Sequence, residues 1–329
     1  MFLIWLLALA GAKGPTSPWK FPHLLADCRV LSTEGVLLRR FPGTICHYLP
    51  SGDYFSASPT GLRAFDRQDV LKWEIPGYFH HSLEFTADRT RLLALGSAVY
   101  DEQGIMHRED IVMVVSLAGE VLHRRSAREL LKLGGGEPFV GYVMPSFYQK
   151  LTGAVQEVSH FNSLHAIPPA LKTMGEARYV LNGAGHGTYL LNEDLSQVIG
   201  RVVMDAQYHG THDAQVTERG TLLFFNNQVR TGTQMYSAVQ EYDLRTKKVI
   251  RDATGEPRGL FFSRFGGGVQ ELDRDRWLFS DNLNGVYLYS HRGKKMLAFL
   301  RELHQLDGRD IPVQHVRNVD LTEFLKHHP

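Results

Sequence analysis

Three of the 16 histidines occupy a shared place in a recurring stretch of sequence, which makes them the first candidates for chemistry. His81, His160 and His212 each lie at, or just before, the start of an alternating apolar and polar segment. Neutral imidazoles bind transition metals, and an imidazole also attacks electrophiles while its neighbours donate hydrogen bonds to developing negative charge. A structural role is the alternative for His81 and His212, as caps of strand ends that bond to the backbone.

Short polar side chains accompany these histidines at what we expect to be the same end of the strands. They are Asn162 and Ser163, Asp213, Asn226 and Asn227, and the run Ser280–Asn282. Polar groups that repeat at a converging end suit a small anionic or polar ligand. Asp213 is also a candidate to orient a histidine, although adjacent residues of a strand point to opposite faces.

The elements that must position these residues are short hairpins that repeat along the chain. The run HDAQVTERGTLLFF from His212 aligns without a gap with GGVQELDRDRWLFS from Gly267. The same frame returns as HSLEFTADRTRLLAL from His81 and more loosely as NSLHAIP from Asn162. A second alternating strand pair with a polar turn follows each frame, as in a hairpin. Two hairpins per unit, at a spacing of about 40–50 residues, indicate the four-stranded blades of a propeller.

The number of units predicts how the ring closes. Five full units begin near Gly43, His80, His160, Gly210 and Gly266. A leading pair of strands, Arg29–Leu31 and Val36–Arg40, lacks its first half, which the tail Val313–Leu321 would supply. We therefore predict an all-β propeller of six four-stranded blades, closed by both termini. A β-sandwich or two smaller β-domains would also explain alternating strands, but not the repeated frame. In a propeller the innermost strands line the central channel, so the three histidines would face one cavity.

Composition agrees with one globular body, predicted over residues 27–329. The chain has 43% hydrophobic and 22% charged residues, and its 36 basic and 35 acidic residues leave a net charge of +1, so no global field favours nucleic acid. Helix is expected only over Ser126–Leu133 and Leu297–Gln305. Aromatic residues near the blade starts are candidate walls for an aryl ligand, with propeller core as the simpler interpretation: Tyr78, Phe79, Phe161 and Phe262.

The N-terminal segment, residues 1–26, is interpreted as a truncated signal or membrane anchor with a lead-in. Its apolar run Phe2–Ala10 is too short to span a bilayer and lacks a basic n-region, although Ala10–Ala12 resembles a cleavage site. This predicts a periplasmic or membrane-anchored protein, with a cytoplasmic one as the alternative. Only Cys28 and Cys46 occur, which fits either one disulfide or two buried thiols.

Together these motifs resemble a known family, the bacterial aryl sulfotransferases. The resemblance covers approximately Phe79 to Leu288 and rests most on GTHDAQVTERGTLLFFNNQ from Gly210, SAVQEYDLRTKKVIRDATGEP from Ser237 and FFSRFGGGVQELDRDRWLFSDN from Phe261. HHS at His80 and HFNS at His160 look like the family's earlier histidine motifs. The family is a β-propeller that moves a sulfuryl group between phenols without a nucleotide donor, through a histidine intermediate.

The resemblance implies roles for individual residues. His212 falls on the nucleophile, and His81 and His160 fall on supporting histidines that, with Asn162, would donate to the sulfuryl oxygens. Asn227 is a further candidate for substrate binding. The partners would be an aryl sulfate and a phenol, and no cofactor or metal is expected.

The family's arginine has no match in this sequence. It would follow the HFNS motif, where this chain has Gly185 and His186. His186, Arg264 and Arg230 are the candidates to replace it, because charge-assisted contacts are the strong ones for a sulfuryl group. Two other function classes stay open, namely a metal-dependent hydrolase or lyase with three histidine ligands and a non-catalytic binding propeller.

Overall fold

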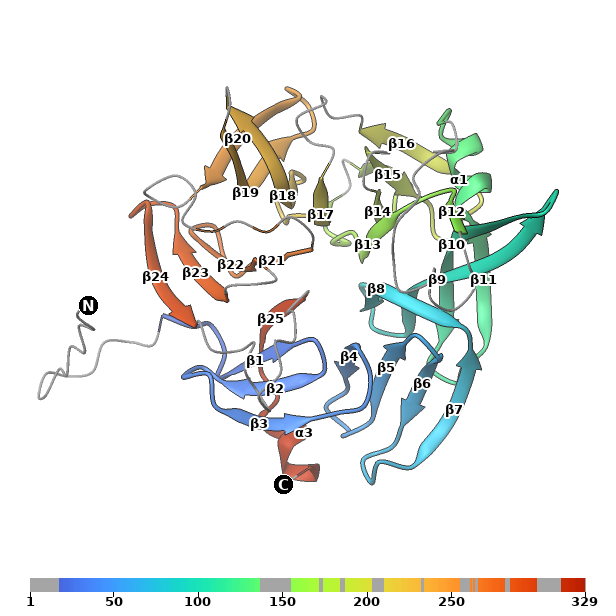
Figure 1. Cartoon of the computed structure of the whole chain (residues 1–329). Coiled ribbons are helices and arrows are strands. Elements are labelled where there is room, and N and C mark those ends of the chain that lie inside the picture. Colours follow the sequence, from blue (N-terminus) through green and yellow to red (C-terminus); the bar gives the residue numbers. More distant parts are fainter. Residues whose placement is uncertain are drawn as a thin grey trace, which may run out of the picture.

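Six four-stranded antiparallel sheets form a ring, with the first strand of each sheet nearest the centre (Figure 1). The computed structural model describes residues 18–136, 155–171, 174–183, 187–202, 210–231, 234–254, 261, 263, 266–281, 285–300 and 315–328. The predicted six-bladed β-propeller is therefore confirmed. Two short helices are the only α-helices among these residues.

The strands follow one another blade by blade. We number the blades 1 to 6 from the one that contains the first strand. Blade 1 consists of β25 (Val316–Val319), β1 (His23–Ala26), β2 (Arg29–Ser32) and β3 (Leu37–Arg40), and blade 2 consists of β4 (Ile45–Tyr48), β5 (Tyr54–Ser58), β6 (Gly61–Phe65) and β7 (Leu71–Pro76). Blade 3 consists of β8 (Tyr78–Phe85), β9 (Arg91–Glu102), β10 (Ile105–Ser116) and β11 (Val121–Ser126), and β12 (Val155–Glu157) pairs in parallel with its strand β10.

The remaining blades repeat this plan. Blade 4 consists of β13 (Phe161–Ala166), β14 (Tyr179–Gly183), β15 (Gly187–Leu191) and β16 (Val198–Val202). Blade 5 consists of β17 (Thr211–Val216), β18 (Leu222–Thr231), β19 (Gln234–Asp243) and β20 (Lys248–Ala253). Blade 6 consists of β21 (Gly268–Glu271), β22 (Arg276–Ser280), β23 (Val286–Ser290) and β24 (Lys295–Leu300). Burial varies with the place of a strand in its blade. Every residue of the second strands β5 and β14 is buried, whereas the outermost strands β3 and β7 have no buried residue.

The apolar core is divided among the interfaces between neighbouring blades. One cluster packs Phe55 and Leu62 of blade 2 against Leu83 and Leu92 of blade 3, and comparable clusters lie at the other five interfaces. A blade therefore buries its faces only against its neighbours, as in other repeat architectures. The folding unit is the ring.

Both termini close the ring, as predicted, but they contribute unequally. The N-terminal part supplies three strands, β1 to β3, and the C-terminal part supplies only the innermost strand, β25, which pairs antiparallel with β1. Strand β1 starts at His23, within the segment that the sequence assigns to the lead-in. The side chain of Asn318 in β25 holds the incoming chain: its Oδ1 accepts from the backbone N–H groups of Lys20 and Phe21 at 3.0 and 2.8 Å, and its Nδ2 donates to two backbone carbonyls.

The two cysteines form a disulfide that joins blade 1 to blade 2. Cys28 lies between β1 and β2, and Cys46 lies in β4. Of the two alternatives left open by the sequence, the structure therefore shows the disulfide.

Of the two predicted helices, one is present and the other is wrong in its described part. Helix α1 (Ala127–Leu133) is capped by Ser126, whose side chain accepts from the backbone of Glu129 while Glu129 bonds back. Residues Lys295–Leu300 instead form β24, because pairing with β23 outweighs local helix preference. Residues 301–305 lie outside the described part. A helix that the sequence did not predict, α3 (Thr322–His327), packs Phe324 against Tyr48.

Candidate active site

The three histidines singled out by the sequence come together at one end of the channel, from three consecutive blades. His81 lies in β8, His160 directly precedes β13, and His212 lies in β17. The ring centroids of His81 and His160 are 5.2 Å apart. His212 lies close enough to His81 to lower the pKa of His81, and His160 lies close enough to His212 to lower the pKa of His212. We call these three residues the histidine cluster.

The ring of His212 is oriented by an asparagine one strand away. Its Nδ1 lies 2.6 Å from Oδ1 of Asn227 and 3.3 Å from the carbonyl oxygen of Gly210. The amide nitrogen of Asn227 donates to the carbonyls of Ser263 and Gly266 at 2.9 and 2.6 Å. Both hydrogens of that amide are therefore used, which turns its oxygen toward His212.

These contacts determine the tautomer of His212. Both partners of Nδ1 are acceptors, so Nδ1 must carry the proton and Nε2 must carry the lone pair. Burial, together with the proximity of His160, lowers the pKa of His212 to about 4. The imidazole is consequently neutral at neutral pH, with one nitrogen available to attack an electrophile.

His160 differs from His212 because its partner is a carboxylate. Its Nδ1 lies 3.1 Å from Oε2 of Glu157, a buried residue of β12. Arg108 of β10 bonds the other carboxylate oxygen of Glu157 through Nη1. This chain of contacts holds the His160 ring as carboxylate and histidine pairs do in acid–base sites.

Arg108 is a central residue of the site that the sequence reasoning missed. Its Nη2 donates to Nε2 of His80 at 2.7 Å and to Oδ1 of Asp110 at 3.1 Å, and its Nε donates to Ser97 at 3.0 Å. Only 4% of its surface is exposed. The signal in the sequence is the run of charged residues at 108–110, which precedes five apolar residues within one strand.

His81 is neutral and lies in an unusual backbone conformation. Its φ is +58°, within an interruption of the β8–β9 register between Phe79 and Leu83. Burial and the neighbouring imidazoles, that of His80 first, hold its pKa well below the ordinary value. A bulge at a functional site commonly re-aims a side chain, and here it lies where the histidine joins the cluster.

Other predicted residues have structural partners in the described part of the chain. Nδ2 of Asn162 donates to the carbonyl of Thr211 at 2.8 Å, and its Oδ1 accepts from Asn182 at 2.9 Å. Asp213 does bond a histidine, but the histidine is His165, at 2.6 Å.

Three of the four aromatic candidates are described. Phe79 and Phe161 belong to the core, whereas Tyr78 is half-buried and lines a pocket beside His81. Phe262, His186 and Arg264 lie outside the described residues, as does the side chain of Arg230, whose backbone belongs to β18. Their predicted roles stay predictions.

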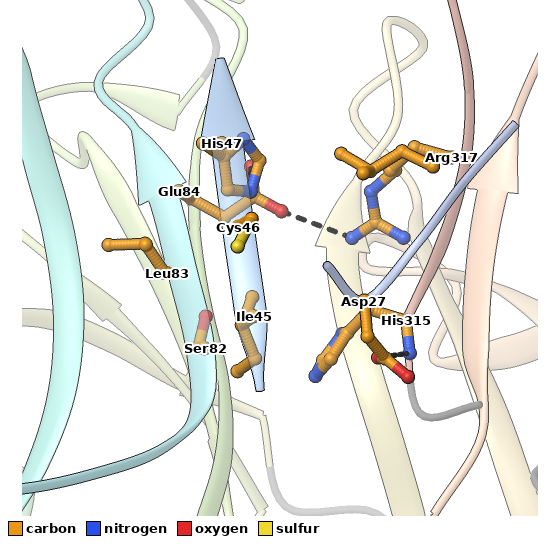
Figure 2. Close-up of a pocket in the computed structure, with 10 residues that line it drawn as sticks. Asp27, Ile45, Cys46, His47, Ser82, Leu83, Glu84, His315 and Arg317 are labelled. Carbon is orange, nitrogen blue, oxygen red and sulfur yellow. Dashed lines mark hydrogen bonds and ion pairs between the residues drawn. The ribbon is translucent and has the colours of Figure 1, made fainter. Parts of the chain in front are cut away.

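A layer of polar side chains crosses the channel beyond the histidine cluster. Each innermost strand contributes one member of this layer, which we call the channel ring: His47, Glu84, His165, Gln215, Gln270 and Arg317. Arg317 of blade 1 bonds Glu84 of blade 3 and Asp213 of blade 5, each at 3.1 Å, so its guanidinium spans the channel. Figure 2 shows Arg317 facing Glu84 and His47 across the gap between their strands.

The charges of the channel ring balance when its partner Asp213 is included. Although burial alone would lower it, contact with Asp213 raises the pKa of His165 to about 9, so this imidazole is cationic. Although burial alone would raise it, the neighbouring His47, His165 and Arg317 hold the pKa of Glu84 below its ordinary value. Two cations, His165 and Arg317, therefore face two carboxylates, Glu84 and Asp213. Among the described residues, no three His, Cys, Asp or Glu side chains are arranged to hold a metal ion, and no helix is long and apolar enough to cross a membrane.

No protein-family model and no curated protein sequence matches this chain. Among solved structures it is similar to a protein of unknown function from Bacteroides caccae, with a TM-score of 0.59 and 10% identity over 89% of this chain and 97% of that chain. It is also similar to dihydro-heme d1 dehydrogenase NirN in complex with DHE (TM-score 0.43, 13% identity, 89% of this chain and 56% of that chain) and to the C-terminal WD40 domain of Sif2 (0.45, 11%, 83% and 61%). At such identities the likeness concerns the fold alone.

Proposed function

We propose that the protein is a histidine-dependent sulfotransferase, which moves a sulfuryl group from an aryl sulfate to a phenol. The observation that carries the proposal is the contact between His212 and Asn227, which leaves a neutral imidazole with its lone pair on Nε2. A nucleophilic histidine needs this state. The resemblance of the sequence to bacterial aryl sulfotransferases, in which the residue matching His212 is the nucleophile, supports the same assignment.

In the first half of the reaction, Nε2 of His212 attacks the sulfur of the aryl sulfate and the bond from sulfur to the phenolic oxygen breaks. The electron pair of that bond leaves with the oxygen, which takes a proton from Nε2 of His160. The sulfated His212 ring is cationic, and its Nδ1–H donates to Oδ1 of Asn227 throughout. This hydrogen bond strengthens as charge develops on the ring.

In the second half, the hydroxyl of an acceptor phenol returns its proton to His160 while its oxygen attacks the sulfur. The bond from sulfur to Nε2 breaks, and the electron pair returns to His212. His81 donates to the sulfuryl oxygens. Arg108 orients His80 and, through Glu157, His160.

The experiment is a burst measurement with 4-nitrophenyl sulfate in excess over the full-length protein. We expect one nitrophenol per protein to be released quickly, and the protein to become heavier by one sulfuryl group on His212. Adding a phenol should then give ping-pong kinetics. The variant His212→Ala should show no burst, whereas His81→Ala should slow it by about 10²- to 10³-fold, as for the loss of one oxyanion donor.

Absence of both the burst and the mass change across several aryl sulfates would reject the proposal. A suitable control is His123→Ala, because His123 lies in β11, away from the histidine cluster. A binding propeller without catalysis would give no burst and would keep its ligand affinity in all three histidine variants.

The disulfide supports a proposal about the compartment. Disulfides such as Cys28–Cys46 persist in oxidising compartments, so we propose that the protein acts in the periplasm or at the outer surface of the cell. Alkylation of free thiols in whole cells tests this: the two cysteines should resist labelling until a reductant is added.

A further inference from the structure

His160 differs from the other two members of the histidine cluster in how its backbone is held. His81 and His212 lie within innermost strands, β8 and β17, whereas His160 belongs to no strand. The chain passes there from β12, which pairs with β10 of blade 3, to β13, the innermost strand of blade 4 (Figure 1). We call residues 158–160 the His160 crossing. The contacts that fix this crossing decide where the His160 ring lies relative to its partners.

A fully buried carboxylate, that of Asp110 in β10, is bonded to both sides of His160. Its Oδ2 accepts from the backbone N–H of Phe161 at 2.6 Å and from the hydroxyl of Ser159 at 3.1 Å. The same hydroxyl accepts from the backbone N–H of Asp110 at 3.1 Å. Ser159 and Phe161 are the sequence neighbours of His160, so Asp110 holds the chain immediately before and after that histidine.

The other oxygen of this carboxylate is bonded on the side of His81. Oδ1 of Asp110 accepts from Nη2 of Arg108 at 3.1 Å and lies 3.0 Å from Nε2 of His80. The ring of His80 contacts that of His81 edge-on, with 4.6 Å between centroids. One side chain therefore joins the residues next to His160 with the residue next to His81.

Asp110 is charged, and its charge limits how far its partners can move. Although burial alone would raise the pKa of Asp110, Arg108 and His80 hold it below its ordinary value. A buried ion pair adds little net stability, because desolvation offsets the attraction between the charges. It does restrict geometry, because a displaced partner leaves a buried charge without its hydrogen bonds.

We propose that Asp110 is a positioning residue, which holds the His160 crossing against blade 3 so that Nε2 of His160 faces the leaving oxygen of the donor. The need for this orientation rests on the proposed function, in which His160 supplies the proton for that oxygen. The hold of Asp110 on the His160 ring does not require any reaction. Because Asp110 has no exposed surface, it acts through the backbone of His160 rather than on the substrate.

The variant Asp110→Asn tests this role through the leaving group. An amide has one accepting oxygen, so it cannot keep the contacts of both carboxylate oxygens. A proton donor matters most for a basic leaving group, so the burst rate with phenyl sulfate should fall by about 10²-fold more than the burst rate with 4-nitrophenyl sulfate. His160→Ala should show the same pattern. A general loss of structure would slow both donors equally.

The matched control is Glu241→Gln, which removes a comparable charge elsewhere. Glu241 is also a fully buried carboxylate bonded to an arginine, Arg219 at 2.9 Å, but it lies in β19, the third strand of blade 5. This variant should not separate the two donors. If Asp110→Asn does not fold, Ser159→Ala removes one bond to the crossing and leaves the carboxylate charged. It should separate the donors in the same direction by a smaller factor.

Crystal structures of the full-length variants test the positioning without the reaction. In Asp110→Asn we expect the His160 ring to move by about 1 Å relative to His212, a displacement that can cost about 10²-fold in rate. Glu241→Gln should leave the ring in place.

An unmoved His160 ring in Asp110→Asn, or equal losses with both sulfates, would overturn the proposal. The same results in Ser159→Ala would overturn it if that variant has to be used. If the wild type gives no burst and the ring moves, the proposed reaction fails and the hold of Asp110 on His160 stands. If the burst is present and the ring does not move, the positioning role fails and the reaction stands.

Discussion

The state of the His212 ring depends on one neighbour, Asn227. Without the amide oxygen of Asn227, Nδ1 of His212 loses the closer of its two hydrogen-bond acceptors, and the lone pair of the ring is no longer confined to Nε2. We predict that Asn227→Ala lowers the rate of the burst by about 10²- to 10⁴-fold, with a much smaller change in KM, as expected for loss of a tautomer. Stopped-flow measurement of nitrophenol release would test this.

The control for that variant is the adjacent residue. The side chain of Asn226 donates to Gln240 at 2.9 Å, so its hydrogen bond stabilises the β18–β19 pair rather than the His212 ring. Asn226→Ala should therefore reduce stability without the same loss of burst rate. A positioning role also predicts that Asn227→Asp retains more activity than Asn227→Ala. Because a carboxylate favours the charged imidazole, Asn227→Asp should also shift the acid limb of the pH profile to higher pH.

The low pKa of His212 gives a second prediction at this scale. In the proposed reaction the neutral ring is the reactive form, so protonation should inactivate the site as the pH falls. With a pKa of about 4, kcat/KM should stay level down to roughly pH 5 and then decline, with no inflection near 6.5 from this residue. An acid limb centred near the ordinary histidine value would show that burial does not keep this ring neutral. The profile should be measured with a donor that does not itself titrate in this range.

Among the elements, blade 1 alone is assembled from both ends of the chain, and the disulfide and Asn318 reinforce it. Cys28 and Cys46 are 18 residues apart, and a cross-link over such a loop typically stabilises a protein by about 3 kcal/mol. We predict that the double variant Cys28→Ser, Cys46→Ser unfolds at lower urea concentration by a corresponding amount. A reductant should lower the stability of the wild type to the same level and leave the variant unchanged. Equal stability of the two proteins without reductant would contradict this.

Sequence and structure agree most closely where the repeated frame applies. Blades predicted to begin near His80, Gly210 and Gly266 have their first strands at Tyr78, Thr211 and Gly268, because each frame encodes the same inner strand. The repeated frame is a local pattern, and it was enough to predict that His81, His160 and His212 lie close together. It did not extend to the outermost strand of blade 6, where a helix-like pattern pairs as β24.

Arg108 could not be placed from the sequence for a physical reason. It lies in β10, a third strand, and such strands are normally remote from the channel. Here β9 and β10 extend over 12 residues each, and β12 pairs in parallel with the extension, so that Arg108 is the register partner of Glu157. That pairing links segments 49 residues apart and lies outside any repeat.

The whole molecule carries an unusual number of buried histidines, and they predict how its stability varies with pH. Burial holds several of them neutral by lowering the pKa, to about 4 in the cases of His80, His212 and His315. Between pH 4 and 6.5 the unfolded chain binds more protons than the folded one, so stability should rise with pH. His165 acts in the opposite direction. Its folded pKa of about 9 exceeds the unfolded value, so its contribution is complete below 6.5 and is lost as the pH rises through 9.

We therefore predict a stability maximum near pH 6.5, measured as the urea midpoint across the range from 4 to 10. The variant His165→Gln should be less stable than the wild type below about pH 9, should approach it above that pH, and should flatten the alkaline decline selectively. An alkaline decline of unchanged slope in that variant would show that another group is responsible. The acid decline should persist, because it belongs to the neutral histidines.

The channel ring also has a consequence for traffic through the molecule. Since Arg317 bonds residues of both blade 3 and blade 5, its side chain narrows the passage along the axis of the propeller. We therefore expect the phenols of the proposed reaction to enter and leave the histidine cluster from the same end of the propeller. The departing phenol and the arriving phenol would then use the same entrance to the histidine cluster, one after the other. The ping-pong kinetics expected of this protein would then follow from its architecture as well as from its chemistry. An excess of the phenol product should slow every turnover, because it occupies the shared entrance.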